Sequence, residues 1–288
     1  MLSVVGEFGL AYGIPRQRDS GAFRWDARPS FARAFLQRIR DWFAPPGVPT
    51  VFHITHHKAG SQWINRILHT LAYNRLVLPE VREGVQNVQF LEKPIRPGMI
   101  YPTVYVTRQE FESVPLPKES RRFIVIRDLR DTLVSAYFSI KHSHAMEHPR
   151  DIEVRRRLQE SNLEDGLLHL LDEWLPDRAS VQESWLGGPD DVLKYEDLLR
   201  DDLKILHRVL IEHCGLQVKP ERLNEVVLAN RFEARAGRKP GTEDVNSHER
   251  KGIAGDWQTH FTDRVAKVFK ARYGALLIAT GYEQNDRW

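Results

Sequence analysis

"FHITHHKAGSQWINRIL", residues 52–68, joins three kinds of segment. The apolar, β-rich run at 52–55 gives way to a short loop that carries Lys58, Gly60 and Ser61. After the loop, apolar residues recur at helical spacing, which predicts one buried helix face made by Trp63, Ile64, Ile67, Leu68 and Leu71. The first backbone N–H groups of a helix have no partner within the helix and attract anions. The stretch therefore predicts an anion site between a strand and a helix.

The loop differs from the common nucleotide-binding loop G-x-x-x-x-G-K-[ST], because no glycine precedes Lys58 at the required distance. This difference disfavours an ordinary kinase or ATPase. The alternative interpretation of the loop alone is a Ser61 helix cap beside a solvated lysine.

Two further segments repeat the order of strand, loop and helix. "RFIVI" (122–126) leads into "RDLRDTLVSAYFSI" (127–140), and "DVLKYEDL" (191–198) leads into a helix from about 197 to 214 that ends at Gly215. Strands that alternate with helices predict an α/β fold with a P-loop-like central parallel sheet and helices on both faces. We expect a single such domain over residues 50–288. Residues 1–49 are expected to form a helical extension packed on the core, through the amphipathic segment "SFARAFLQRIRDWF" (30–43).

Ligands of such sheets bind at the carboxyl ends of the strands. Arg127 stands at one such end, with Arg130 beside it and Ser135 in the next helix, so a second phosphate group is expected there. A surface network of Arg–Asp pairs is the alternative. A third cluster, "HERKGIAGDWQTHFT" (248–262), places Arg250 and Lys251 before two glycines, where backbone amides and two cations can meet one phosphate. Two long polar stretches, 141–162 and 237–252, are candidate lids.

The composition excludes several classes of protein. A net charge of +3 gives no strong field toward nucleic acid, and no apolar run reaches the ~18 residues of a membrane span. One cysteine excludes an intramolecular disulfide and suits a reducing compartment, so a cytoplasmic protein is expected. The histidines show no recurring ligand spacing, so no metal is expected.

Three motifs, in order, resemble those of the PAPS-dependent sulfotransferases, in particular their cytosolic-type branch. The family's Y-P-K-S-G-T-T-W, R-D/N-x-x-D-x-x-x-S and R-K-G-x-x-G-D-W read here "HHKAGSQW" (56–63), "RDLRDTLVS" (127–135) and "RKGIAGDW" (250–257). "KYEDL" (194–198) is similar to the family's Y-E-D-L, and "NRF" (230–232) to a segment that ends in an aromatic residue. The resemblance covers roughly residues 50–262.

The resemblance implies a site for the donor PAPS and the product PAP, without a metal. The residues that it implies for the 5′-phosphosulfate are Lys58, Ala59, Gly60, Ser61 and Gln62. Those that it implies for the 3′-phosphate are Arg127, Ser135, Arg250, Lys251 and Gly252, and for the adenine Trp63, Tyr195 and Phe232. Ala59 and Gln62 depart from the family's serine and threonine, so that a hydroxyl contact is lost and an amide is available in its place.

The family's catalytic K-T-H is missing. Its nearest counterpart is "YVTRQEF" (105–111), in which Arg108 follows Thr107. We therefore predict that Lys58 stabilises the leaving group and that His57 takes the acceptor's proton. Glu110 is the carboxylate alternative, His56, His142 and His144 are further candidates, and a reaction without a protein base stays open. The family's dimer motif appears only as "QTHFTDRVAK" (258–267), so the oligomeric state is not predicted.

The expected function is transfer of a sulfuryl group from PAPS to a hydroxyl or amine acceptor of unknown identity. Because the family histidine is absent, a non-catalytic nucleotide-binding module is one alternative. A phosphotransferase with a variant loop is the other.

Overall fold

The computed structural model describes residues 47–82, 85–86, 88–144 and 149–288, so the predicted helical segment at 30–43 and most of the predicted extension lie outside it. The elements, in chain order, are β1 (Thr50–Thr55), α2 (Ser61–Ala72), the 3₁₀ turn η1 (Tyr73–Arg75), β2 (Val81–Arg82), β3 (Val85–Gln86), α3 (Val88–Leu91), β4 (Ile100–Val104), α4 (Arg108–Glu112), β5 (Ser120–Ile126), α5 (Leu129–Phe138), the π-helical turn η2 (Ser139–Ser143), α6 (Pro149–Glu160), α7 (Leu163–Glu173), α8 (Leu175–Ser184), β6 (Val192–Lys194), α9 (Tyr195–Leu206), the π-helical segment η3 (His207–His213), α10 (Pro220–Ala229), α11 (Phe232–Ala236), the 3₁₀ turn η4 (Asp256–Thr259) and α12 (Asp263–Ala279).

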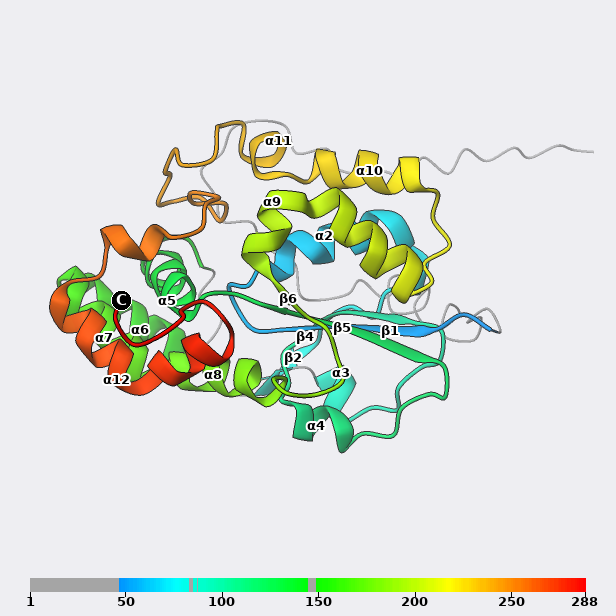
Figure 1. Ribbon diagram of the computed structural model, residues 1–288, viewed down its shortest axis with the longest axis horizontal. Helices are drawn as coiled ribbons and strands as arrows, with labels where there is room; N and C mark the ends of the chain where they lie inside the picture. Colours follow the sequence, from blue (N-terminus) through cyan, green and yellow to red (C-terminus); the bar gives the residue numbers. More distant parts are fainter. Residues whose placement is uncertain (1–46, 83–84, 87, 145–148) are drawn as a thin grey trace, which may run out of the picture.

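The centre of the fold is a parallel four-stranded sheet in the order β4-β1-β5-β6 (Figure 1). β1 lies between β4 and β5, and each of its six residues is buried. A mostly apolar run such as 51–54, in which His53 is the exception, is typical of a strand covered on both faces. The predicted class of fold is confirmed, and the three strands predicted from the sequence are β1, β5 and β6.

The fourth strand, β4, was not predicted. Its sequence "IYPTV" contains Pro102, which cannot donate a backbone hydrogen bond and so argues against a strand. The structure resolves this conflict by placing β4 at the edge of the sheet, where it pairs with β1 and Leu76 adds an isolated bridge to Ile100. The Pro102 carbonyl also interacts with His53 of β1, whose Nδ1 lies 2.6 Å away.

Helices cover both faces of the sheet, as predicted. On one face α2, α9, η3 and α10 pack over the strands, and Ile64, Ile67 and Leu68 of the predicted apolar stripe are fully buried there. On the other face α3 and α4 pack beside the end of α8, around Phe52 and Trp185. The predicted helix after β6 consists of α9 and η3, and Gly215 follows with a positive φ of 65°.

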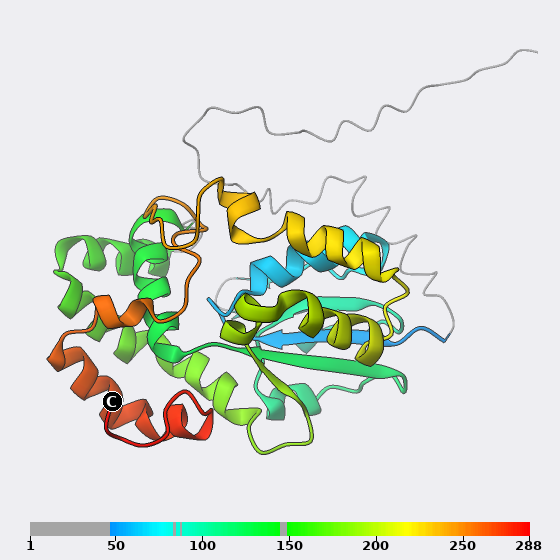
Figure 2. The ribbon, with the colours of Figure 1, turned by 45° about the horizontal axis from the view of Figure 1, so that its top comes forward.

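A second group of helices, α5 to α8 with α12, lies beyond the carboxyl ends of the strands and has its own apolar core (Figure 2). β5 runs directly into α5, and the segment between α11 and η4 connects the sheet-covering helices to this group. The two predicted lids differ in structure, since the first contains α6 whereas 237–252 has no regular element. The candidate site therefore lies where the sheet ends and the second helical group begins.

Candidate functional site

The loop after β1 makes a sharp turn into α2. Lys58 has a φ of 69° and is the one non-glycine residue with positive φ in the described parts of the chain. Such a conformation costs roughly 1–2 kcal/mol and is found most often at functional sites. Gly60, with a φ of 82°, precedes the first residue of α2, and no side chain among the described residues caps this helix start. The sequence prediction that these first N–H groups bind an anion stays a prediction.

Gly60 is also required by close packing. A Cβ atom at this position would lie 2.7 Å from the ring of Tyr195, the first residue of α9. Trp63 meets the same ring edge to face, with 6.3 Å between the ring centroids. Ala59 is fully buried, and Gln62 is half-buried in the first turn of α2. Two aromatic side chains predicted to frame a base therefore stand beside the predicted anion loop.

Lys58 connects the three predicted clusters electrostatically. Burial, followed by the positive charges of Arg127 and Arg250, lowers its pKa to about 8, while Glu249 acts in the opposite direction. Cations in such a cluster repel one another unless an anion lies among them. The loops that carry Lys58, Arg127 and Arg250 are distant in the sequence, but they lie close enough together for the two arginines to affect the charge of Lys58.

Arg127 leaves the end of β5 and is held by the surrounding loops. Its Nη1 donates to the Lys58 carbonyl oxygen at 2.9 Å, and its guanidinium lies 4.8 Å from the ring centroid of Tyr195. The carboxylate of Asp131, four residues on, lies 3.7 Å away. Within the part of the chain that is described, the buried Nε of Arg127 has no hydrogen-bond partner. The buried donor is consistent with an anion ligand at this position.

Arg130, expected beside Arg127, points elsewhere. It forms ion pairs with Asp128 at 2.7 Å and Glu283 at 2.5 Å. Its guanidinium also lies 4.0 Å and 4.5 Å from the ring centroids of Trp257 and Trp288. Arg130 therefore belongs to a buried ion-pair network with Asp128 and Glu283, and not to a surface pair with Asp131, and it joins the C-terminal residues to α5.

The loop from 250 to 257 is fastened to the start of α5. The buried carboxylate of Asp131 accepts hydrogen bonds from the backbone N–H groups of Gly255 (2.7 Å) and Trp257 (2.9 Å). Arg250 and Lys251 both contact the buried carboxylate of Asp256. This contact holds both cations on the loop, and the charge of Arg250 acts on Lys58.

Phe232, the third predicted aromatic residue, lies against the same loop. A Cβ atom on Gly252, whose φ is 66°, would lie 2.4 Å from the Phe232 ring. Ser135 is half-buried on α5. The predicted nucleotide residues are thus contributed by β1–α2, β5–α5, α9, α11 and the loop before η4, all at the carboxyl edge of the sheet.

His57 lies next to Lys58 with its imidazole against the ring of Tyr105, at a centroid distance of 3.9 Å. Burial lowers the pKa of His57 well below its usual 6.5, and the charges of Arg178, His56 and Lys58 lower it further. The imidazole is therefore neutral at pH 7 and able to accept a proton.

The other candidates for the base have different surroundings. His56 is buried, with its Nε2 3.0 Å from Gln182 and its Nδ1 3.0 Å from the His57 carbonyl oxygen. Glu110 is exposed and caps α4, since its carboxylate accepts from the Thr107 N–H at 2.7 Å. His142 is exposed, and its ring lies against Phe138. His144 is also exposed, but its charge acts on His57, so it lies closer to the loop.

Arg108, which stands where the family histidine is expected, is turned away from the loop. Its guanidinium packs 5.1 Å from the Trp185 ring centroid and donates to the backbone at the end of α8. Three residues near His57 and Lys58 were not predicted as site residues from the sequence, namely Tyr105, Arg178 and His248. The only sequence signal for Tyr105 is its position three residues before Arg108.

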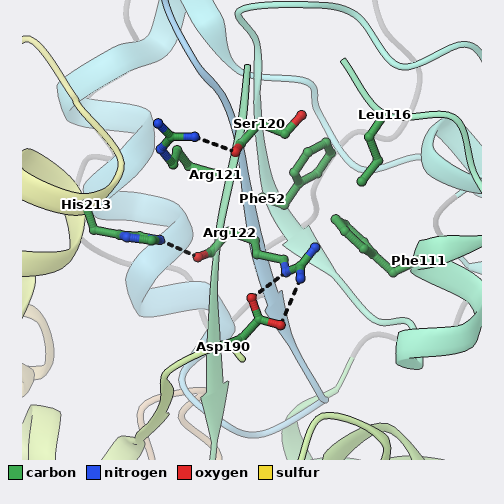
Figure 3. Close-up of a pocket in the computed structure, with 8 residues that line it drawn as sticks. All are labelled: Phe52, Phe111, Leu116, Ser120, Arg121, Arg122, Asp190 and His213. Atoms are coloured by element: carbon green, nitrogen blue, oxygen red, sulfur yellow. Dashed lines mark hydrogen bonds and ion pairs between the residues drawn. The ribbon is translucent and has the colours of Figure 1, made fainter. Parts of the chain in front are cut away.

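A separate hollow of about 250 Å³ lies at the opposite end of β5 (Figure 3). Phe52, Phe111 and Leu116 line one side, and the Arg122 guanidinium on the other is held by Asp190 at 2.7 and 2.9 Å. None of the predicted site residues lines this hollow.

Over residues 48–281 the chain matches the family model of the sulfotransferase domain. A 3-alpha-hydroxysteroid sulfotransferase of Cavia porcellus is 25% identical over 264 residues, which cover 84% of this chain and 88% of the relative. Sulfotransferase 2A1 of Homo sapiens is 24% identical over 265 residues, with 83% and 87% covered. A crystal structure of a mouse sulfotransferase complexed with PAP aligns with a TM-score of 0.58 at 17% identity, covering 86% of this chain and 94% of the mouse protein.

The chain therefore belongs to the sulfotransferase domain family. It is a PAPS-dependent sulfotransferase, an enzyme that transfers a sulfuryl group from PAPS to an acceptor and releases PAP. In the described ranges no helix is both long and apolar enough to cross a membrane. The described residues also contain no group of three or more side chains able to ligate a metal ion.

Proposed function

We propose that the junction around Lys58 is the donor site and that His57 is the base that activates the acceptor. The observation that carries the proposal is the convergence of Arg127 and Arg250 on Lys58 at the open start of α2. The fit of a nucleotide is supported by the rings of Tyr195 and Phe232, which pack directly against Gly60 and Gly252 of the two loops, and by the buried Nε of Arg127.

In this proposal the two ends of the donor are held separately. Lys58, the first N–H groups of α2 and the Ser61 hydroxyl bind the 5′-phosphosulfate, with Gln62 beside them. Arg127, Arg250, Lys251, Gly252 and Ser135 bind the 3′-phosphate. Trp63, Tyr195 and Phe232 frame the adenine.

PAPS supplies an activated sulfuryl group with PAP as the leaving group, and transfer of this kind depends mainly on positioning and on charge stabilisation. Lys58 neutralises the negative charge that develops on the leaving oxygen.

His57 is placed to remove the acceptor's proton. Its imidazole adjoins Lys58 in sequence and is neutral at pH 7, since burial lowers its pKa. Glu110 is less well placed, because its carboxylate is engaged in the cap of α4. We therefore keep His57 as the base, and Glu110 serves as the comparison.

The acceptor in this proposal carries a hydroxyl group or an amine. Two of the related proteins are named for hydroxysteroids, which supports a hydroxyl acceptor as the first class to test. The cytoplasmic location expected from the single cysteine is part of the same proposal.

The donor site is tested by thermal unfolding with PAP and with ATP–Mg²⁺. Ligand at 100 times its dissociation constant stabilises the folded state by roughly 2.7 kcal/mol. We expect PAP to raise Tm without added metal, and Lys58→Met to reduce the shift. A Tm that rises with ATP–Mg²⁺ and not with PAP would contradict the site. Sulfated product, detected by mass spectrometry over a panel of alcohols and amines, then identifies the acceptor class.

A further inference from the structure

Tyr105 lies between the imidazole of His57, the proposed base, and the hydroxyl of Ser61, which is proposed to bind the phosphosulfate. It follows β4 directly, and its ring stacks on the His57 imidazole with a centroid distance of 3.9 Å and an interplanar angle of 28°. Its hydroxyl donates to Ser61 Oγ at 2.9 Å. One side chain therefore contacts both the candidate base and the serine hydroxyl that is proposed to bind the phosphosulfate.

The stack fixes the plane of the imidazole. His57 follows the end of β1 in an irregular loop, where the sheet no longer holds the backbone. The Tyr105 ring covers one face of the imidazole, and Trp174 meets it edge to face with 6.3 Å between centroids. A proton acceptor must be held within a few tenths of an ångström of its productive position, and neighbouring side chains usually provide this restraint.

The hydrogen bond fixes the direction of the Ser61 hydroxyl. A hydroxyl group has one donor and two acceptor sites. Because Ser61 Oγ accepts from Tyr105, its own hydrogen is available to an anion at the start of α2. Hydrogen bonds in such a chain polarise and strengthen one another. Burial raises the pKa of Tyr105, so its hydroxyl remains a donor at neutral pH.

We propose that Tyr105 is a positioning residue that aligns the His57 imidazole through its ring and the Ser61 hydroxyl through its own hydroxyl. It couples binding of the donor to activation of the acceptor. Tyr105 precedes the segment where the family histidine is missing, and Arg108 in that segment is turned toward α8. This inference rests on the proposed function, because the ring has a catalytic effect only if His57 is the base.

Two substitutions separate the two contacts. Tyr105→Phe keeps the ring and removes the hydroxyl, so PAP binding should weaken by about 3–10-fold, the range for one hydrogen bond, with a smaller fall in kcat. Tyr105→Leu removes the stack as well, and kcat should fall by about 10²-fold, as misplacement of a catalytic group by about 1 Å does. The same variant should displace the acid limb of the pH–rate profile.

Tyr101, on the strand β4 that Tyr105 follows, provides the matched control. Its ring stacks on Phe52 with 5.1 Å between centroids, and its hydroxyl accepts from the Arg96 N–H at 3.0 Å, at a distance from the site. Tyr101→Phe and Tyr101→Leu should lower Tm at least as much as the Tyr105 variants. They should leave PAP affinity and the pH profile close to those of the native protein. If they reproduce the Tyr105 effects, those effects come from loss of stability and the proposal is wrong.

A double-mutant cycle with His57→Ala decides whether Tyr105 acts through the imidazole. In the His57→Ala background, Tyr105→Leu should lower kcat by less than about 3-fold, because the group that it aligns is gone. An undiminished loss there, together with unchanged PAP affinity in Tyr105→Phe, would overturn the inference. If His57→Ala alone keeps its rate, the proposed base is wrong. The PAP affinity of Tyr105→Phe then shows separately whether the hydrogen bond to Ser61 supports donor binding.

Discussion

Arg127 donates a hydrogen bond to the carbonyl oxygen of Lys58 at 2.9 Å, so the arginine at the end of β5 also holds the loop at the end of β1. The two phosphate positions of the proposed site therefore share a residue. Removal of Arg127 is expected to affect both positions.

Arg127→Ala should weaken PAP binding by about 1.5–3 kcal/mol, the range for hydrogen bonds to charged groups. It should also weaken AMP binding, although by less, because the Lys58 loop loses its support. Lys251→Ala is the comparison, since Lys251 contacts Asp256 and not the Lys58 loop. It should weaken PAP binding and leave AMP binding nearly unchanged. Calorimetric titration with both nucleotides checks this, and equal losses for PAP and AMP in Lys251→Ala would contradict its assignment.

PAP binding should depend on pH through Lys58. In the free protein the pKa of Lys58 is about 8, whereas a bound phosphate favours the ammonium form and raises the pKa of the complex. Affinity should therefore be constant below pH 8 and fall above it, by up to about tenfold per pH unit. In Lys58→Met this decline should disappear, because the remaining arginines stay charged. If PAP affinity still falls above pH 8 in Lys58→Met, the titrating group is not Lys58.

His57→Ala should lower turnover by about 10²–10⁴-fold, the range for general-base catalysis, with PAP affinity within a few-fold of native. Because the pKa of His57 is well below 6.5, the neutral imidazole persists to lower pH than an ordinary histidine. The acid limb of the native rate profile should therefore lie below the usual histidine range. Glu110→Ala is the control. It should lower the stability of α4, because it removes the helix cap, and leave turnover close to native. The opposite pattern would make the carboxylate the base.

Gly252→Ala should weaken both PAP and AMP binding by about 1–3 kcal/mol, the range for loss of one base–aromatic stack. The added Cβ atom would lie 2.4 Å from the Phe232 ring and push it aside. Gly255→Ala is the matched control, because its φ is also positive at 78° but no atom lies within 4 Å of the new Cβ. It should cost roughly 1–2 kcal/mol of backbone strain and leave nucleotide affinity nearly unchanged. Fluorescence titration with AMP compares the two variants.

Asp131→Asn should loosen the loop that carries Arg250 and Lys251. The amide replaces a carboxylate that accepts from the Gly255 and Trp257 N–H groups, so about 1–3 kcal/mol of stability should be lost. PAP affinity should fall with it. Asp172→Asn, which removes a surface ion pair with Arg272, should cost less than about 1 kcal/mol and leave PAP affinity unchanged. Denaturant unfolding and hydrogen exchange at Gly255 would show the difference, and equal protection in both variants would contradict the anchoring role.

The sequence by itself determined the elements whose signals are local. The alternation of apolar runs and helical spacing predicted β1, α2, β5, α5 and the parallel sheet, because each pattern lies within one short segment. The three motifs also predicted Lys58, Arg127 and Arg250 as site residues, and Lys58 and Arg127 follow parallel strands, whose ends meet at one edge of the sheet. β4 escaped prediction because Pro102 obscures its pattern, and only its place at the sheet edge makes that proline acceptable.

The tertiary structure decided which polar side chains point into the site. Arg127 and Arg130 are three residues apart, yet Arg127 reaches Lys58 while Arg130 lies between Trp257 and Trp288 from the C-terminal part of the chain. Tyr105 meets His57 only because β4 pairs with β1, and this contact joins residues 48 positions apart. Pairings of this kind depend on packing between distant segments, so no local pattern encodes them. The neutral state of His57 has the same origin, because burial among residues of several elements lowers its pKa.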